Sequence, residues 1–345
     1  MGTTRLRSLD VFRGLTVAAM VLVNSPGSDE VYAPLRHSVW SGWTPTDLIF
    51  PSFLVILGVS AAFSDRARRA RGERPGEHAR RALLRAAFLF GLGVIENWFE
   101  FSSHGAVRLP GVLQRIALCA LGVEAFLALG RPRLEAAGAA ALLLGYWALL
   151  GGDVTPGGNF AYALDRRLLG PHLLDDRWGD PEGLLSTLPA LATCLIGVLA
   201  GRALCAAGPA LARRLGEAGL GLAAAGSLWS LAFPLNKHLW TSSFALFSGG
   251  LALAGLAACL RLVEGRPARW AAPFEALGRG ALAAYVLAGA GYGILEFLDL
   301  KRPLNGLFEP FMSQRGASAL FALAYTAACA AAASLVAQRL DRRQQ

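Results

Sequence analysis

Residues 5–60 read RLRSLDVFRGLTVAAMVLVNSPGSDEVYAPLRHSVWSGWTPTDLIFPSFLVILGVS, a pattern that predicts two membrane helices joined by a short polar loop. The loop contains Asn24, His37 and Trp40, and the second helix opens with Asp47. Polar side chains at a membrane boundary cost free energy unless they have partners, so each of them calls for a reason. His37 is the strongest candidate for chemistry, because an imidazole gains or loses a proton near neutral pH.

The whole chain predicts an all-α, polytopic membrane protein. Of its 345 residues, 54% are hydrophobic and 17% are charged, whereas soluble domains average about 25% charged residues. We therefore predict a single transmembrane domain over residues 1–345, built as a bundle of about ten helices of roughly 20 apolar residues each. The predicted spans are residues 9–23, 47–63, 82–98, 111–129, 134–150, 184–204, 215–233, 239–260, 274–297 and 317–337.

One polar segment between these spans is long, covering residues 151–183. Its Gly and Pro residues predict turns, with one short helix near residues 161–169. A loop of this length is usually functional or disordered. Three aromatic residues, Phe160, Tyr162 and Trp178, favour an ordered cap on the outer side.

The formal net charge of +9 does not predict a nucleic-acid partner, because the basic residues follow the topology of a membrane protein. With the spans above, one side of the membrane carries Arg5, Arg7, Arg66, Arg68, Arg69, Arg71, Arg74, Arg80, Arg81, Arg131, Arg133, Arg202, Arg213, Arg214, Arg261, Arg266, Arg269, Arg339, Arg342 and Arg343. The other side carries Arg36, Arg108, Arg166, Arg167, Arg177, Lys237, Lys301, Arg302 and Arg315. Cytoplasmic segments are the ones enriched in basic residues. We therefore predict that both termini are cytoplasmic and that His37 lies on the outer side.

The cysteines do not indicate a metal centre or a disulfide framework. The five of them lie within or at the ends of apolar helices, and no C-x-x-C pair occurs. Small, weakly polar thiols in such positions are typical of packing residues.

Asp10 and Arg13 lie three residues apart, on one face of the first predicted helix. Two interpretations stay open: the pair orients the helix, or it forms a wall of a polar cavity. In the loop that follows, Asn24 precedes Pro26-Gly27 and either caps a helix end or contacts a ligand.

Asp47 has a sufficient structural explanation. Thr44 or Thr46 can act as the N-cap of the second helix, and a carboxylate suits the positive end of a helix dipole. His37 has no comparable explanation.

Two further clusters lie on later helices. Gln114 and Arg115 fall in the first turns of an otherwise apolar helix, where an arginine must pair, snorkel or line a wet cavity. A tight outer turn holds Asn236, Lys237 and Trp240. Its structural interpretation is an interfacial belt of Lys and Trp.

Six motifs follow one another in an order that resembles the heparan-α-glucosaminide N-acetyltransferase family and its bacterial relatives. They are RSLDVFRG (7–14), HSVWSG (37–42), DLIFP (47–51), PGVLQR (110–115), DPEG (180–183) and NKHLW (236–240), with Asn24 between the first two. The motifs run from residue 7 to residue 240, and the remaining helices agree in character only. The order of the set is more specific than any one motif.

The resemblance implies a transmembrane acyltransferase. It would move the acetyl group of cytosolic acetyl-CoA, its co-substrate, to the amino group of a glucosamine on the far side of the membrane, without a metal. The active histidine of the family corresponds to His37, and Asn24 would lie near the acetyl group. The residues implied to hold the two substrates are Asp10, Arg13, Trp40, Gln114, Arg115, Asn236, Lys237 and Trp240.

The resemblance also implies a place in the cell and a kind of acceptor. A bacterial relative would be a multi-pass protein of the cell inner membrane, surrounded by the lipid bilayer. From the resemblance we expect outer loops shorter than those of the lysosomal enzyme and, as in bacterial relatives, no counterpart of its extra N-terminal region. We therefore expect an amino sugar from the cell wall or from nutrients rather than heparan sulfate. The sequence leaves the acceptor and the oligomeric state open, a homodimer included.

Amine acetylation needs an uncharged amine, and a neutral imidazole can take the proton that the ammonium must lose. On this hypothesis Asp47 orients His37 and Asn24 stabilises the oxyanion. Acetylation of His37 itself is an open second route. Two other classes remain: an O-acyltransferase acting on a polysaccharide, and a sugar transporter that uses the intramembrane charges.

Overall fold

A computed structural model describes residues 6–101, 106–174 and 179–343. Within these ranges the chain folds into helices joined by loops, and no strand is formed. The all-α class is therefore confirmed. Arg5, Arg177 and Trp178 lie outside the described residues.

The chain divides into two compact units. The first unit contains residues 38–43 and 50–254, and the second unit contains residues 6–37, 44–49 and the chain from residue 255 onward.

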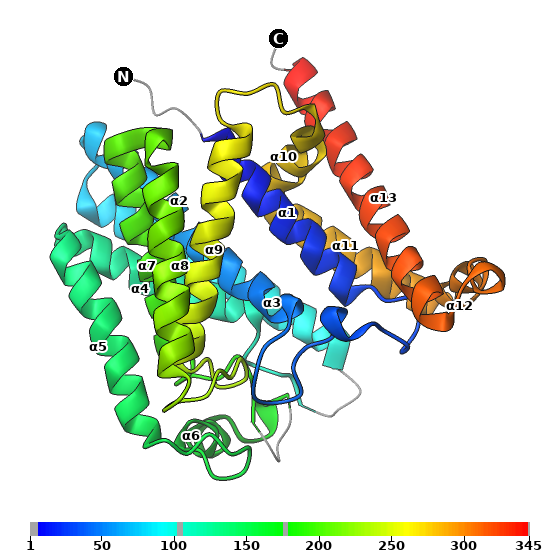
Figure 1. Ribbon diagram of the computed structural model, residues 1–345, viewed down its shortest axis with the longest axis horizontal. Coiled ribbons are helices and arrows are strands. Elements are labelled where there is room, and N and C mark those ends of the chain that lie inside the picture. The colour runs from blue at the N-terminus through cyan, green and yellow to red at the C-terminus, as the bar shows by residue number, and fades with distance from the viewer. Residues whose placement is uncertain (1–5, 102–105, 175–178, 344–345) are drawn as a thin grey trace. The chain divides into compact units, whose positions relative to one another are not determined.

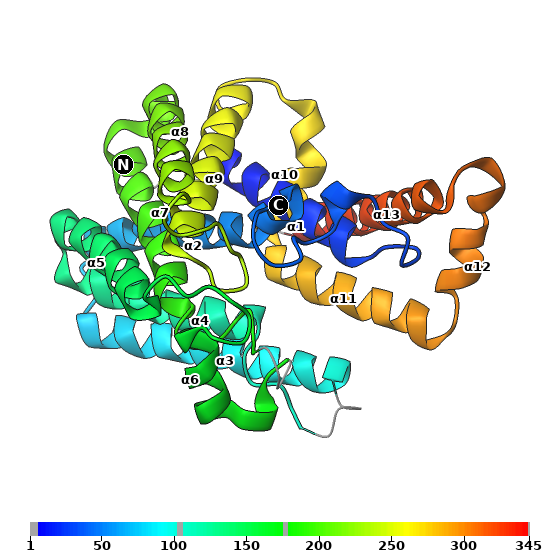
Figure 2. The same ribbon diagram turned by 60° about the horizontal axis from the view of Figure 1, so that its bottom comes forward.

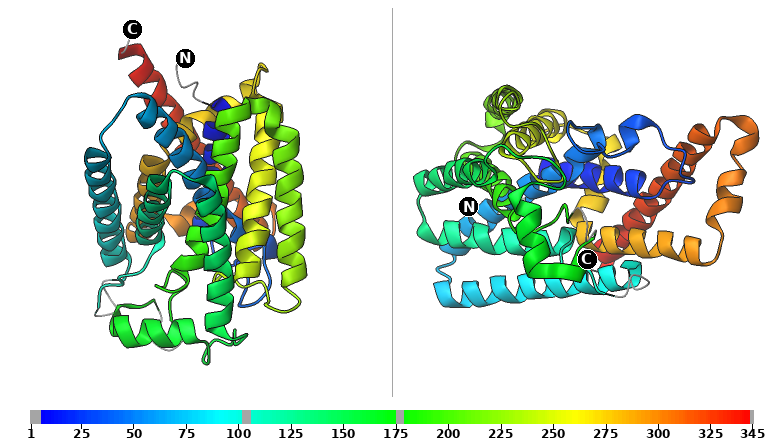
Figure 3. Two further views of the ribbon diagram at one scale, coloured as in Figure 1. Left: turned by 90° about the vertical axis from the view of Figure 1, so that its left-hand side faces the viewer. Right: turned by 90° about the horizontal axis from the view of Figure 1, so that it is seen from below.

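Among the described residues, the first unit contains seven helices and the larger part of an eighth. They are α2 (Ile49–Ala70), α3 (Pro75–Phe101), α4 (Val112–Leu129), α5 (Pro132–Leu150), α6 (Phe160–Leu169), α7 (Thr187–Ala207), α8 (Ala212–Trp229) and the larger part of α9 (Ser242–Val263). Helices α3 and α4 lie side by side (Figure 3). The chain reverses direction at the short 3₁₀ helix η5 (Gly208–Leu211), between α7 and α8 (Figure 1).

Glycines let the helices of the first unit approach closely. A Cβ atom on Gly58 of α2 would lie 1.9 Å from the carbonyl oxygen of Cys194 on α7. Gly219 of α8 and Gly250 of α9 face one another in the same way. Small residues at such crossings are the usual means by which helices pack in lipid. Around them, the buried core contains Leu54, Val123, Leu195 and Phe244.

Local sequence signals set several helix ends in this unit. Pro132 opens α5, and Gly130 and Gly151, which end α4 and α5, adopt left-handed φ angles of 67° and 58°. Asn159 caps α6 by accepting a hydrogen bond from the backbone N–H of Tyr162 at 2.8 Å. The short helix predicted near residues 161–169 is confirmed as α6.

The second unit consists of α1 (Arg7–Asn24), the loop after it, the end of α9, and the C-terminal helices. These are α10 (Ala272–Arg279), α11 (Ala281–Phe297), α12 (Lys301–Gly306) and α13 (Gln314–Arg343). Helix α12 connects α11 to α13 at one end of both (Figure 2). Gly14 of α1 brings that helix against the backbone of Phe274 in α10, because a Cβ atom there would lie 1.7 Å from the carbonyl oxygen of Phe274.

One predicted span is wrong in its continuity. Residues 274–297 form two helices, α10 and α11, which meet at Gly280 with a bend of 83°. Glycine is a poor residue for a helix interior, and both Gly278 and Gly280 lie at this point. Gly278 also packs on the backbone of Asp10, where a larger side chain would collide.

The number of membrane spans depends on how broken helices are counted. Among the described residues, seven helical stretches are long and apolar enough to cross a membrane, or eight if the bent pair α10–α11 is one span. Helix α1 is not among them, and α7 with α8 counts as one stretch of 43 residues despite its reversal. A helix overlaps every predicted range, so the predicted bundle is confirmed, with its count of about ten an approximation.

Candidate functional site

The loop between α1 and α2 folds around the start of the second helix. It contains two short 3₁₀ helices, η1 (Ala33–Leu35) and η2 (Pro45–Leu48), and the second of these leads directly into α2. Thr44 is the N-cap residue and forms a capping box with Asp47, whose Oδ2 accepts from the backbone N–H of Thr44 at 2.9 Å. The predicted cap by Thr44 is therefore confirmed. Asp47 serves as the third helical residue, the position at which a carboxylate reaches back to the cap.

The same carboxylate contacts His37 with its other oxygen. Oδ1 of Asp47 lies 2.7 Å from Nδ1 of His37. The side chain of Asp47 is fully buried, whereas that of His37 is 48% exposed. Because an ionised carboxylate only accepts hydrogen bonds, the contact favours a proton on Nδ1 and leaves the basic lone pair of a neutral imidazole on Nε2.

Two hydroxyl groups hold this loop in shape around His37. Oγ1 of Thr44 donates to the carbonyl oxygen of Arg36 at 2.6 Å, and Oγ1 of Thr46 donates to that of Pro34 at 3.0 Å. The guanidinium of Arg36 in turn donates to the carbonyl oxygen of Asp29 at 3.0 Å. His37 therefore follows a residue whose backbone and side chain are both hydrogen-bonded within the loop.

Asn24 and the charged pair of the first helix lie at opposite ends of α1. Asn24 is the last residue of the helix and is exposed. Asp10 lies 14 residues earlier, about 21 Å along the axis at 1.5 Å per residue. Arg13 donates to Oδ1 of Asp10 at 2.9 Å and to the carbonyl oxygen of Gly278 at 3.3 Å. Within the second unit, the structure thus places Asn24, but not the Asp10–Arg13 pair, at the end of α1 where the His37 loop begins.

Trp40 belongs to the first unit and packs against the segment that follows α5. Its ring stacks on that of His238 with centroids 5.2 Å apart and meets Tyr162 of α6 edge-on at 5.8 Å. Its Nε1 donates to the carbonyl oxygen of Val154 at 2.7 Å. The described part of the loop 151–183 therefore forms an ordered cap.

Arg115 is buried in the first unit, where it holds the segment that joins the cap to α7. Its Nη2 donates to the carbonyl oxygens of Pro181 at 2.7 Å and Gly183 at 3.3 Å, and also contacts Oγ of Ser186. Its guanidinium lies 5.2 Å from the ring centroid of Trp240. Nε and Nη1 of Arg115 are buried without a hydrogen-bond partner among the described residues.

The other predicted substrate residues of this unit also have structural contacts. Gln114 is buried beside Gly93 and Gly111. Oδ1 of Asn236 accepts from the backbone N–H of Leu239 at 2.8 Å, which fixes the tight turn before α9. Lys237 of that turn is partly buried.

A cluster of charges between the α3–α4 connection and the segment before α7 was not predicted from the sequence. Arg108 donates to both oxygens of Asp180 at 2.8 Å and to Glu182 at 2.7 Å. Burial alone would lower the pKa of Arg108, but these hydrogen bonds and charges outweigh it and raise the pKa. Burial, with the nearby charge of Asp180, raises the pKa of Asp165 on α6 to about 6, although a hydrogen bond from Leu184 opposes the shift. The motif DPEG contains Asp180 and Glu182. Nothing in the sequence indicated that Arg108, 72 residues before Asp180, would pair with them.

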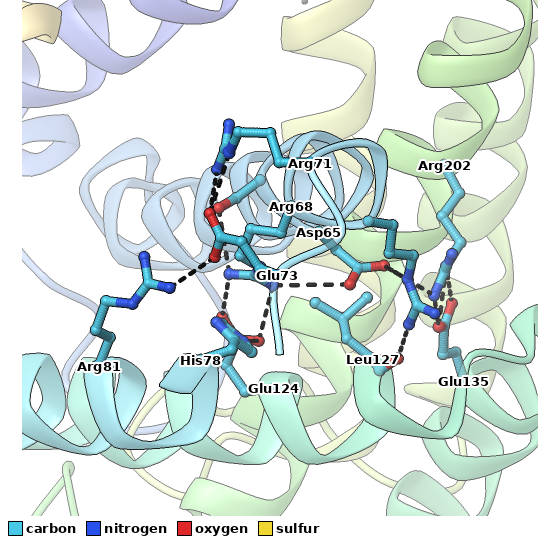
Figure 4. A network of polar contacts seen from close by, with 12 residues as sticks. Asp65, Arg68, Arg71, Glu73, His78, Arg81, Glu124, Leu127, Glu135 and Arg202 are labelled. Atoms are coloured by element: carbon cyan, nitrogen blue, oxygen red, sulfur yellow. Dashed lines mark hydrogen bonds and ion pairs between the residues drawn. The ribbon is translucent and has the colours of Figure 1, made fainter. Parts of the chain in front are cut away.

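An ionic network in the first unit connects the ends of five helices, α2, α3, α4, α5 and α7 (Figure 4). Three arginines face three carboxylates: Arg68 contacts Glu124 at 3.1 Å, Arg69 contacts Asp65 at 2.9 Å, and Arg202 contacts Glu135 at 2.5 Å. His78 lies 2.6 Å from Glu124. In the sequence these arginines indicate only the topology, because nothing there shows which carboxylates face them.

The comparisons with known proteins agree on one family. Residues 5–232 match the model of the catalytic part of heparan-alpha-glucosaminide N-acetyltransferase. The human (Homo sapiens) protein of that name is 27% identical over an alignment 349 residues long, which covers 82% of this chain and 52% of the human protein. The mouse (Mus musculus) protein is 37% identical over 118 residues, covering 33% of this chain and 18% of the mouse protein. The chain thus spans about half the length of the human relative, and its match to the mouse relative spans 18% of that protein. Because the family model matches well over half of the chain, this protein belongs to the heparan-α-glucosaminide N-acetyltransferase family.

Proposed function

We propose that this protein is a transmembrane N-acetyltransferase that moves the acetyl group of acetyl-CoA to the amino group of an amino sugar. The contact between Nδ1 of His37 and the buried carboxylate of Asp47 carries the proposal. A histidine oriented by a carboxylate is the arrangement that removes a proton from a nucleophile in many transferases and hydrolases. The family match supports the same reaction class.

In the proposed reaction the amine nitrogen attacks the carbonyl carbon of the thioester. A carbon–nitrogen bond forms, and Nε2 of His37 takes the proton that the nitrogen must lose. The intermediate then collapses, the carbon–sulfur bond breaks, and the imidazolium returns the proton to the leaving thiolate. The products are the N-acetylated sugar and CoA, and Asp47 stabilises the imidazolium while the proton resides there.

Asn24 is the proposed donor to the oxyanion that develops on the carbonyl oxygen. A side-chain amide supplies a neutral N–H donor of the kind that stabilises such a charge. Its place at the end of α1, where the His37 loop begins, supports this role.

The proposed substrate contacts are Asp10, Arg13, Trp40, Gln114, Arg115, Asn236, Lys237 and Trp240. Arg115 also has a structural role, since its Nη2 forms hydrogen bonds with Pro181 and Ser186 of the segment before α7.

We propose in addition that acetyl-CoA binds from the cytoplasm and that His37 faces the outer side of the inner membrane, with both termini cytoplasmic. The exposed arginines of the α2–α3 turn, Arg71 and Arg74, support this orientation through the positive-inside rule.

Two exposed positions test the orientation. Val39, two residues after His37, is 95% exposed, and Gly76 has open space around it. In oriented vesicles, Val39→Cys should react with an impermeant thiol reagent added outside and Gly76→Cys should not. The reverse labelling would refute the orientation.

The reaction is tested by substituting His37. His37→Ala should fold and bind acetyl-CoA, but transfer to glucosamine should fall at least about a hundredfold, the lower end for a missing general base. His37→Gln keeps a hydrogen-bonding side chain without a titratable nitrogen and should be equally inactive. The readout is the labelled acetyl group in an amide product. Near-normal transfer by either folded variant would defeat the assignment, whereas an acetylated His37 formed with acetyl-CoA alone would replace direct transfer by a two-step route.

A further inference from the structure

The loop that carries His37 is fastened to the C-terminal helices of the second unit. The residues that fasten it lie between residues 292 and 321, beyond the residues 5–232 that match the family model. Nothing in the motifs of the chain pointed to them.

The first attachment is made by Ser318 of α13. Its Oγ accepts from the backbone N–H of Ser28 at 3.1 Å and lies 3.2 Å from the carbonyl oxygen of Ser28. Its own carbonyl oxygen accepts from the backbone N–H of Gly27 at 3.3 Å. The side chain of Ser318 is almost fully buried. One residue of α13 therefore holds the backbone of two consecutive loop residues, Ser28 through its hydroxyl and Gly27 through its carbonyl oxygen.

The second attachment is made by Tyr292 of α11. Its hydroxyl donates to the carbonyl oxygen of Pro26 at 2.8 Å. Lys301 of α12 lies over the same ring, with Nζ 5.2 Å from the centroid. Two C-terminal helices thus hold the three consecutive residues that follow directly after Asn24 and Ser25.

Close packing and an ion pair add to these bonds. A Cβ atom on Gly27 would lie 2.9 Å from Cβ of Phe321 on α13 and 2.1 Å from Oδ1 of Asn305 on α12. Arg315 of α13 contacts Glu30 of the loop at 3.1 Å. The loop therefore approaches both helices with no space for a side chain at residue 27.

These contacts connect to His37 through the loop itself. Ser28 is followed by Asp29, whose carbonyl oxygen accepts from Arg36. The carbonyl oxygen of Arg36 accepts from Thr44, the cap partner of Asp47. We infer that Ser318 and Tyr292 are positioning residues, which set the place of Asn24 and of the His37–Asp47 pair for acetyl transfer. The inference rests on the proposed function of that pair.

The kinetic test removes one hydroxyl at a time. Ser318→Ala and Tyr292→Phe should each lower kcat about tenfold, the effect of one lost hydrogen bond on a barrier, and leave the KM for acetyl-CoA unchanged. The matched controls are Ser334→Ala, whose hydroxyl bonds only within α13 to Ala330, and Tyr325→Phe, whose hydroxyl bonds to Ala288 of α11. The controls should keep the wild-type kcat. Equal losses in variants and controls would overturn the inference.

A double-substitution cycle separates positioning from general destabilisation. If Ser318 acts through the His37 loop, Ser318→Ala should lower the residual transfer of the His37→Ala protein by clearly less than the roughly tenfold expected in the wild type, because only the placement of Asn24 is left to lose. If it only stabilises the fold, the same tenfold loss should recur in that background, which would refute the positioning role.

A spin label gives a readout that does not depend on activity. Ala33→Cys places it on the exposed 3₁₀ turn η1 of the loop, in a background where the partly exposed Cys205 and Cys329 are serine. Ser318→Ala should increase the mobility of the label and Ser334→Ala should not. Unchanged mobility in Ser318→Ala would refute the attachment. Normal transfer by His37→Ala would refute the proposed function of His37 but not the attachment of the loop. The mobility of the label would still show whether α13 holds the loop.

Discussion

Replacing Asp47 by Asn tests whether the two oxygens of this carboxylate have separate tasks. In the wild-type protein Oδ2 accepts from the N–H of Thr44 at 2.9 Å, and Oδ1 lies 2.7 Å from Nδ1 of His37. An amide has one oxygen and one NH₂ group, so it can accept on one side only. Asp47→Asn must therefore alter either the helix cap or the proton on His37.

Which orientation the amide adopts depends on which hydrogen-bond donors each orientation leaves without a partner. If the amide oxygen faces His37, the NH₂ group meets the N–H of Thr44, and a buried donor without a partner costs about 1–3 kcal/mol. If the oxygen faces Thr44 instead, the NH₂ group donates to Nδ1 and the imidazole carries its proton on Nε2. The second arrangement keeps the N–H of Thr44 and one amide N–H paired, so it should be favoured. It removes the lone pair that the amine needs, so kcat should fall by about 10²–10⁴, while the unfolding free energy should fall by only about 1 kcal/mol.

Labelled acetyl transfer and thermal unfolding of the purified variant measure the two effects separately. The control is Asn159→Ala, which removes the N-cap of α6 and should cost a similar amount, about 1 kcal/mol, without lowering kcat. An Asp47→Asn protein whose kcat stays within about threefold of the wild type, less than 1 kcal/mol in the barrier, would refute the tautomer argument.

Three further predictions concern the first unit. Gly58→Ala should destabilise the protein by about 1–3 kcal/mol, because the added methyl group meets Cys194 at 1.9 Å, whereas Gly91→Ala, with open space around it, should stabilise by up to about 1 kcal/mol; equal unfolding temperatures would contradict the close approach. Because burial raises the folded-state pKa of Asp165 to about 6, its contribution to stability is fully present below its ordinary pKa of 3.8 and is lost as pH rises through about 6. The unfolding temperature should therefore drop between about pH 4 and pH 6 by an amount that Asp165→Asn removes, and an identical pH profile in that variant would count against the shift. Arg115→Lys should lower the unfolding free energy by about 1–3 kcal/mol, since one ammonium cannot reproduce these buried contacts; unchanged stability with a raised KM would make Arg115 chiefly a ligand contact.

The fold was predictable from the sequence wherever the length of an apolar run alone determines that a helix forms. An apolar run of the right length can only become a helix in lipid, which is why a helix overlaps every predicted span. The bend between α10 and α11 was not predictable, because residues 274–297 remain apolar across it. The early start of α3 at Pro75 was also missed, since its first turns are polar and lie outside the apolar pattern.

The local part of the candidate site was predictable for a similar reason. Thr44 and Asp47 are three residues apart, so the capping box is a property of the local sequence. Contacts across long sequence separations were not, and Ser28 with Ser318 is an example. The arginines of the ionic network show the same limit, because a count of positive charges does not reveal that Arg68 and Arg202 face Glu124 and Glu135.

The bend at Gly280 has a consequence for the charged pair of the first helix. The last carbonyl groups of a helix lack donors from their own helix, and hydrocarbon offers no water in their place. At the end of α10 the carbonyl oxygen of Gly278 receives its donor from Arg13, a residue near the opposite end of the chain. In a straight helix through residues 272–297, the carbonyl oxygen of Gly278 would accept from a backbone N–H of the same helix and would not need the guanidinium of Arg13. The charge on α1 and the break between α10 and α11 therefore depend on one another. Loss of Arg13 should be tolerated only if the carbonyl oxygen of Gly278 receives a hydrogen bond from its own helix instead.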